Sequence, residues 1–246
     1  SSARPNWRRI PQMEPSSVRI ASILQMDFIV GAKSSTSIFE SLCNRKFALA
    51  RPPLRPFFFA MEVATEIKAV ALDAMGSDKG PSEVVAGLSI ALKNGWVAEN
   101  IHLVGKESVL TELLEEHELQ AHPQIILHPA QEVILMSESP IQSIRRKPDA
   151  SLVRTIELVK QGKCGAAVSC GNTGSLMACS TIKLRPVQGV SKPALASVWP
   201  SANSRFIVLD VGANPECRPE NLLHYAILGH QYAKDALGIA KPRVGL

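Results

Sequence analysis

The stretch from residue 164 to 184 constrains the fold most, because a short apolar run, a glycine turn and a helix-forming segment follow one another directly. Residues 166–170 can be buried on both faces, as a strand inside a parallel sheet requires. The turn GNTG at 171–174 then leads into a helix expected from about 175 to 184. Such a junction directs backbone N–H groups and the positive end of a helix dipole at one point, so it suits an anion. The alternative is a strand-to-helix turn that merely needs glycine.

The segment before this stretch repeats the same order of elements. Apolar runs at 67–73, 101–104 and 125–128 predict strands, and the amphipathic segments 81–95 and 108–117 between them predict helices. A proline at the first helical position supports a helix start at Pro81. The alternation predicts an α/β fold, a three-layer α/β/α sandwich with a mostly parallel sheet.

Further elements are expected along the rest of the chain. Residues 131–149 break the pattern and predict a surface excursion. The expected elements after it are a helix at 151–161, neighbouring strands at 194–199 and 205–210, a helix at 219–237 and the start of a strand at 242–246. Because that strand begins at the last residues, we expect the domain to be truncated at its C-terminus.

Residues 1–60 differ from the remainder in composition. They hold nine of the 27 Lys/Arg but only three of the 22 Asp/Glu, and they show no sustained periodicity. We expect a disordered leader or upstream extension here, with Met61 as the natural start and 61–246 as the α/β domain. An organelle transit peptide is the alternative that the Arg/Ser-rich, acid-poor composition permits.

Charge and cysteine content exclude several classes of protein. The net charge of +5 arises in the leader, since residues 61–246 hold 18 Lys/Arg against 19 Asp/Glu. We therefore expect no nucleic-acid binding, which needs basic residues on the folded domain. Five cysteines without a CxxC pair indicate reduced thiols in a cytosolic protein. The six histidines show no metal-ligand spacing, so we expect no metal. We also expect no cofactor.

Three junctions share one pattern, in which an apolar run ends in a polar or acidic residue and a glycine turn follows. They read DAMGSD at 73–78, SCGNTG at 169–174 and DVGAN at 210–214. Ligands of open α/β sheets bind at the carboxyl ends of the strands, so the three turns are expected to converge there. Lys79 supplies the cation of the first loop. The turns match neither GxxxxGK[ST] nor GxGxxG, which argues against nucleoside triphosphates and dinucleotides.

At these residues the chain resembles the PlsX phosphate acyltransferases of bacterial phospholipid synthesis. The matching motifs are DAMGSDKGP at 73–81, SCGNTGSLM at 169–177, KPAL at 192–195, LDVGAN at 209–214 and PRVGL at 242–246. The resemblance covers about 66–246 and the N-terminal two thirds of a family member. It implies a fold similar to isocitrate dehydrogenases and phosphate acetyltransferases, and a homodimer.

The resemblance also implies a reaction, in which acyl-(acyl carrier protein) and inorganic phosphate give acyl phosphate and free carrier. It implies a cytoplasmic location, with peripheral membrane association alongside a glycerol-3-phosphate acyltransferase. The catalytic candidates are Asp73, Lys79, Asn172, Asp210 and Asn214. The candidates for binding phosphate or substrate are Gly76, Ser77, Asp78, Ser169, Gly171, Thr173, Gly174 and Gly212.

The expected roles follow the chemistry of each group. Gly76 and Gly171 to Gly174 would bind phosphate through backbone N–H groups, and Lys79 would neutralise its charge. Asn172 or Asn214 would face the thioester oxygen, and Asp73 and Asp210 would orient neighbouring loops. Arg145, Arg146 and Lys147 form a charge run that is either simply solvated or docks an acidic carrier protein.

The chain also departs from the family pattern. The first loop commonly reads Gly-Gly-Asp-His, whereas Ser77 and Lys79 replace its second glycine and its histidine. Pro215 and Glu216 follow Asn214 where a smaller or acidic pair is usual. Two other functions stay open: a phosphate acetyl- or butyryltransferase that uses acyl-coenzyme A, and an inactive acyl-carrier-binding or scaffold domain.

Overall fold

The computed structural model describes residues 69–246 except 98, 187–189, 191, 202–203 and 215. The predicted leader at 1–60 and the first two residues of the strand expected at 67–73 lie outside the described residues. The elements are β1 (Ala69–Asp73), α3 (Pro81–Lys93), β2 (Asn100–Gly105), α4 (Glu107–Glu116), β3 (Ile125–Pro129), α5 (Pro140–Arg146), α6 (Ser151–Lys160), β4 (Ala166–Ser169), α7 (Thr173–Leu184), β5 (Ala196–Pro200), β6 (Arg205–Leu209) and α8 (Pro219–Asp235).

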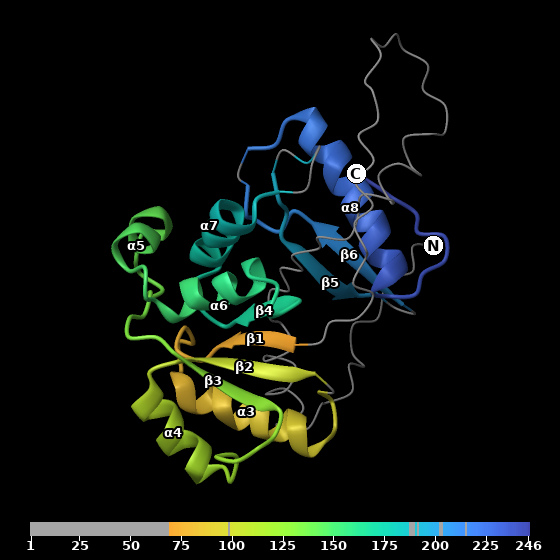
Figure 1. Ribbon diagram of the computed structural model, residues 1–246. Helices are drawn as coiled ribbons and strands as arrows, with labels where there is room; N and C mark the ends of the chain where they lie inside the picture. Colours follow the sequence, from red (N-terminus) through yellow and green to blue (C-terminus); the bar gives the residue numbers. More distant parts are fainter. Residues whose placement is uncertain (1–68, 98, 187–189, 191, 202–203, 215) are drawn as a thin grey trace, which may run out of the picture.

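Four strands form one parallel sheet in the order β3-β2-β1-β4. In the view of Figure 1, α3 and α4 lie below this sheet, and α6 and α7 lie above it. The arrangement confirms the predicted three-layer α/β/α fold with a mostly parallel sheet. From β1 the chain runs outward to β2 and β3, and it then returns to place β4 on the other side of β1. The direction of winding therefore reverses between β1 and β4.

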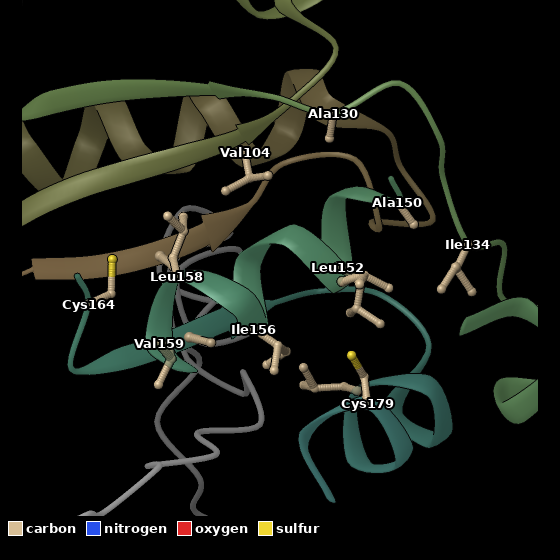
Figure 2. Close-up of a cluster of buried hydrophobic side chains, with 14 of the residues drawn as sticks. Val104, Ala130, Ile134, Ala150, Leu152, Ile156, Leu158, Val159, Cys164 and Cys179 are labelled. Carbon is tan, nitrogen blue, oxygen red and sulfur yellow. The ribbon is translucent and has the colours of Figure 1, made fainter. Parts of the chain in front are cut away.

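Each face of the sheet carries its own apolar core. Side chains alternate along a strand, so Ala69 and Ala71 of β1 point to the α6 face and Leu72 points to the α3 face. Figure 2 shows the core on the α6 face, where Leu152 and Ile156 pack among residues of the sheet and of α7. The core on the other face joins β1, β2 and β4 to α3 and α4.

The segment 131–149 was expected to be a surface excursion; most of its residues are exposed or half-buried, but it also contributes to the core. It contains α5, which packs against α7, and both Ile134 and Ile144 are buried in the core of Figure 2. A bridge between Glu132 and Ala150 runs parallel, as in the sheet. Helix α5 has only seven residues, so its apolar spacing is too short for the sequence pattern alone to reveal the helix.

β5 and β6 form a separate two-stranded sheet. They pair in antiparallel register, with Trp199 opposite Phe206, which confirms that they are neighbours. Within the described ranges, these two strands and α8 pack extensively only on one another. β6 therefore does not end at the carboxyl edge of the parallel sheet. The third loop, which follows β6, was expected to converge with the other two at that edge, and the sheet topology does not support this expectation.

No helix in the part of the chain that the structure describes is long and apolar enough to cross a membrane.

Candidate functional site at the reversal of strand order

The loops after β1 and β4 touch through their glycines. A Cβ added to Gly76 would lie 2.9 Å from Gly171 Cα, and one added to Gly171 would lie 3.2 Å from Gly76 Cα. Both distances are shorter than ordinary contact, so neither position accepts a side chain without movement. In open α/β sheets, ligands bind where the strand order reverses, outside the carboxyl ends of the strands. The structure therefore brings the first two predicted loops together at the place that the topology favours for a ligand.

Asp73 lies beneath this contact and connects the two loops. Its side chain is fully buried at the end of β1. Oδ2 accepts a hydrogen bond of 2.7 Å from the Ser169 hydroxyl, and Oδ1 accepts one of 3.1 Å from the Met75 amide. Ser169 Oγ in turn accepts a bond of 3.1 Å from the Gly171 amide. This chain of bonds fixes the relative position of the two loops.

Burial and hydrogen bonding act on Asp73 in opposite directions. Burial raises the pKa of the carboxyl above its ordinary value, because an ionised carboxylate loses its hydration. The hydroxyl of Ser169 and the amides of Met75 and Gly76 oppose this rise, since they stabilise the ionised form. An acceptor that serves several donors is most effective as the carboxylate, so the bonding pattern suits an ionised Asp73 that holds its neighbours in place.

Ser151 also belongs to this site, and the sequence reasoning missed it. It begins α6, it is 1% exposed, and its hydroxyl has no hydrogen-bond partner of good geometry in the described part of the chain. The hydroxyl nevertheless lies near enough to lower the pKa of Asp73. No local pattern marks Ser151, because only the packing of α6 on β1 brings it to the carboxylate.

Asn172 caps the helix that leaves the second loop. Its Oδ1 accepts a bond of 2.9 Å from the Ser175 amide, so α7 begins at Thr173 rather than near residue 175 as expected. Its Nδ2 donates to the carbonyls of Met136 at 2.9 Å and Glu138 at 3.4 Å. Both ends of the side chain thus have protein partners, and its expected role at the thioester stays a prediction.

The first turn of α7 is closely packed. A Cβ on Gly174 would lie 3.1 Å from Pro140 Cγ of α5 and 3.3 Å from Asn172 Oδ1. Ser175 is fully buried, and its hydroxyl has no hydrogen-bond partner among the residues that the structure describes. A Cβ at residue 174 would therefore require Pro140 or Asn172 to shift by a few tenths of an ångström.

The remaining residues of the first loop are more exposed. Ser77 Oγ accepts a bond of 3.2 Å from the Lys79 amide, and the turn closes through a bond of 3.0 Å from the Gly80 amide to the Ser77 carbonyl. Asp78 and Lys79 are both exposed. Lys79 has no ion-pair partner among the described residues, so its charge is available to a ligand.

The third loop has a separate, internally bonded structure. Asp210 Oδ1 accepts bonds from the amides of Leu195 at 2.8 Å and Ala213 at 3.3 Å. Asp210 Oδ2 accepts from the amide and the side chain of Asn214, at 2.7 and 3.1 Å. Asn214 Nδ2 also donates to the Pro193 carbonyl at 2.8 Å. Asp210 thus braces its own loop, in which Gly212 has a φ of 108°, and a part for this loop in the site stays a prediction.

Cysteines and histidines do not form a reactive centre in the described ranges. Burial raises the pKa of Cys164 and Cys179 to about 11, and that of Cys170 also rises, so all three thiols are poor nucleophiles near neutral pH. His102 and His128 stack with a bond of 2.9 Å between ring nitrogens. No three His, Cys, Asp or Glu side chains gather as a metal site among the described residues.

The fold and this site define a class of protein: an α/β sandwich with two touching glycine loops and a buried carboxylate at the reversal of its strand order. Among known families, the model described as "Fatty acid synthesis protein" matches residues 68–246. The chain belongs to this family, as its motifs indicated.

Individual relatives agree with the family assignment. The chain is 41% identical over 177 residues to a phosphate acyltransferase of Desulforudis audaxviator. The matched region covers 72% of this chain and 51% of that protein. It is 42% identical over 181 residues to the phosphate acyltransferase of Heliobacterium modesticaldum, covering 72% and 52%. A phosphate acyltransferase of Clostridium tetani is 41% identical over 179 residues, with coverage of 72% and 52%. The chain therefore spans about half the length of the curated relatives it matches.

Proposed function

We propose that this protein transfers a fatty acyl group from acyl-(acyl carrier protein) to inorganic phosphate, which forms acyl phosphate for phospholipid synthesis. The contact of Gly76 with Gly171 at the reversal of strand order is the observation that carries the proposal. At this contact the backbones of the two loops carry no side chains, and they lie next to the buried carboxylate of Asp73 and the capped N-terminus of α7. Backbone N–H groups at a helix N-terminus favour an anion such as phosphate. The names of the relatives support the same chemistry.

The reaction needs positioning more than it needs a strong catalyst. A phosphate oxygen forms a bond to the thioester carbonyl carbon, the C–S bond breaks, and the proton of hydrogen phosphate passes to the departing thiolate. Both reactants are already activated, since phosphate is an anionic nucleophile and the thioester is an acyl donor. Correct placement of the two can lower the barrier by roughly 7–11 kcal/mol. Each donor directed at the developing oxyanion contributes roughly 3–4 kcal/mol.

Backbone groups have the main part in this mechanism. The amides of Gly76 and of Gly171 to Gly174 bind phosphate, and Lys79 neutralises part of its charge. The amides of Gly76 and Gly171 do so after exchanging their present bonds to Asp73 and Ser169. Asp73, held by Ser169, keeps the two loops in register without taking part in proton transfer. Asn172 or Asn214 donates to the thioester oxygen after exchanging one of its present partners. The 3.4 Å bond from Asn172 to the Glu138 carbonyl is the longest of these and so the easiest to exchange.

The wider setting follows from the same proposal. The protein acts as a homodimer in the cytoplasm, with acyl-(acyl carrier protein) and phosphate as its substrates. It associates peripherally with the membrane, where a glycerol-3-phosphate acyltransferase consumes the acyl phosphate. No nucleic acid takes part.

A trapping experiment tests the reaction and the identity of the donor. The purified protein is incubated with phosphate and either palmitoyl-(acyl carrier protein) or palmitoyl-coenzyme A, and acyl phosphate is captured with hydroxylamine as the hydroxamate. We expect product with the carrier-linked donor, and none when phosphate is omitted. Equal or greater product with the coenzyme A donor would favour the phosphate acetyl- or butyryltransferase class. Absence of product with both donors would contradict the proposal.

A further inference from the structure

α5 and the loop before it carry exposed side chains of mixed character. Leu135, Met136 and Ile141 are 57%, 47% and 52% exposed. Arg145 and Arg146 lie in the last turn of α5 and are also exposed. Ile141 and Arg145 are four residues apart, so they share one face of the helix. We call these five residues the α5 surface. Figure 1 shows α5 at the outer edge of the molecule.

Hydrogen bonds of Glu138 and Lys147 brace the α5 surface. Glu138 accepts hydrogen bonds from the Leu135 amide at 3.1 Å and from Ser143 Oγ at 2.9 Å, and it forms an ion pair with Lys147. Lys147 also donates to the Val133 carbonyl at 2.8 Å. Because Lys147 is engaged in this way, it does not contribute a free charge. Arg145 and Arg146 have no ion-pair partner among the described residues, so the surface is net positive.

Two contacts join this surface to the candidate site. The side-chain amide of Asn172, which caps α7, donates to the carbonyl of Met136. Pro140, at the start of α5, lies so close to Gly174 that a Cβ there would approach it to 3.1 Å. A molecule held on the α5 surface is therefore held next to the N-terminus of α7, where we place the phosphate.

We propose that the α5 surface is the docking site of an acidic acyl carrier protein. The proposal rests on the proposed function, since only an acyl donor must be presented beside the phosphate. Arg145 and Arg146 meet carboxylates of the carrier, and Leu135, Met136 and Ile141 cover apolar side chains between those carboxylates. Complementary charge of this kind directs association and fixes the register of the partners. An anionic membrane could also bind the two arginines, but it would not need to lie next to the N-terminus of α7. Because the acyl donor must be held there, we favour the carrier.

Direct binding tests the proposal with a matched control. Fluorescently labelled palmitoyl-(acyl carrier protein) is titrated with the protein, and anisotropy gives the dissociation constant. The double variant Arg145→Gln/Arg146→Gln removes two charges from the last turn of α5. The control Lys93→Gln/Lys160→Gln removes two exposed charges from the last turns of α3 and α6. A third variant, Ile141→Ser, removes apolar surface without a change of charge.

We expect the arginine double variant to bind about tenfold more weakly, with a smaller salt dependence, as loss of two exposed interfacial charges predicts. Ile141→Ser should also weaken binding, and the lysine control should bind as the unmodified protein does. Turnover of palmitoyl-coenzyme A, if present, should not change in any variant. Equal binding by the arginine variant and the control, or no binding by the unmodified protein, would overturn the proposal. Loss of binding to phosphatidylglycerol vesicles with carrier binding unchanged would also overturn it.

The same experiment separates this inference from the proposed reaction. Binding is measured without catalysis, so a protein that binds the carrier through α5 but forms no acyl phosphate refutes the reaction alone. A protein that forms acyl phosphate from the carrier with equal binding in all variants refutes the docking site alone.

Discussion

Replacement of Gly76 by alanine is the most informative single change in the site. The new Cβ would lie 2.7 Å from Asp73 Oδ2, which is about 0.7 Å inside the 3.4 Å at which ordinary contact begins. It would also lie 2.9 Å from Gly171 Cα, so the loop cannot simply move toward β4. The carboxylate has to shift, although its Oδ2 holds the 2.7 Å bond from Ser169. A shift of that size takes the bond beyond the usual range for O–H···O contacts.

The magnitude follows from these two effects. Overpacking of a close contact costs typically 1–3 kcal/mol, and loss of a hydrogen bond to a charged group costs about 1.5–3 kcal/mol. Because one movement of Asp73 relieves the first while causing the second, the two costs do not add, and we expect the free energy of unfolding to fall by about 1.5–3 kcal/mol. The second-order rate constant for phosphate should fall about 100-fold, as misplacement by about 1 Å predicts.

Urea unfolding and the hydroxamate assay measure these two quantities. The control is Gly245→Ala, since a Cβ at Gly245 has open space around it and the glycine has no left-handed φ. We expect the control to change stability by less than about 0.5 kcal/mol, as surface substitutions do. If Gly76→Ala were as stable and active as Gly245→Ala, the close approach of the two loops would not matter and the site would be refuted.

Three further predictions concern single side chains of the site. The pKa of Asp73 in the folded protein lies above its ordinary 3.8, so between pH 3.8 and the folded pKa the folded state binds more protons than the unfolded state, and stability falls as the pH rises through this interval. Asp73→Asn should reduce this fall when urea midpoints are measured upward from pH 3.8. An unchanged pH profile would contradict the burial of the charge. Asn172→Ala should destabilise the protein by about 1 kcal/mol more than Asn172→Ser, which keeps a capping oxygen. Thermal unfolding at equal protein concentration measures this difference, and equal stability of the two variants would contradict the capping role of Asn172. Lys79→Ala should raise the KM for phosphate far more than the KM for the acyl donor in steady-state assays; equal effects on both would rule out its role at phosphate.

The sequence predicted most of the parallel sheet and its helices. Strands such as 166–169 are continuous apolar runs, and helices such as 81–93 begin at a proline and keep an apolar face, so local patterns suffice for them. Helix α5 was not predicted, because the burial of its inner residues depends on contact with α7, which is distant in sequence. β5 and β6 were predicted as neighbours, but their separation from the parallel sheet was missed, because strand patterns do not say which sheet a strand joins.

The candidate site was predictable in part. Asp73, Gly76, Ser169 and Gly171 stand in motifs, and the structure brings them together. The double use of Asn172, as a cap and as a tie to Met136, required the fold. Ser151 had no sequence signal, since a serine in the first turn of a helix is common for other reasons.

The central claim is that inorganic phosphate binds to the backbone amides of the two touching loops. Titration of the ¹⁵N-labelled protein with phosphate, followed by amide chemical shifts, tests this directly. The account predicts saturable shifts at Gly76, Gly171 and Gly174, with the distant Gly95 and Gly162 unchanged. Saturable shifts confined to other parts of the chain, or none at these three glycines, would contradict it.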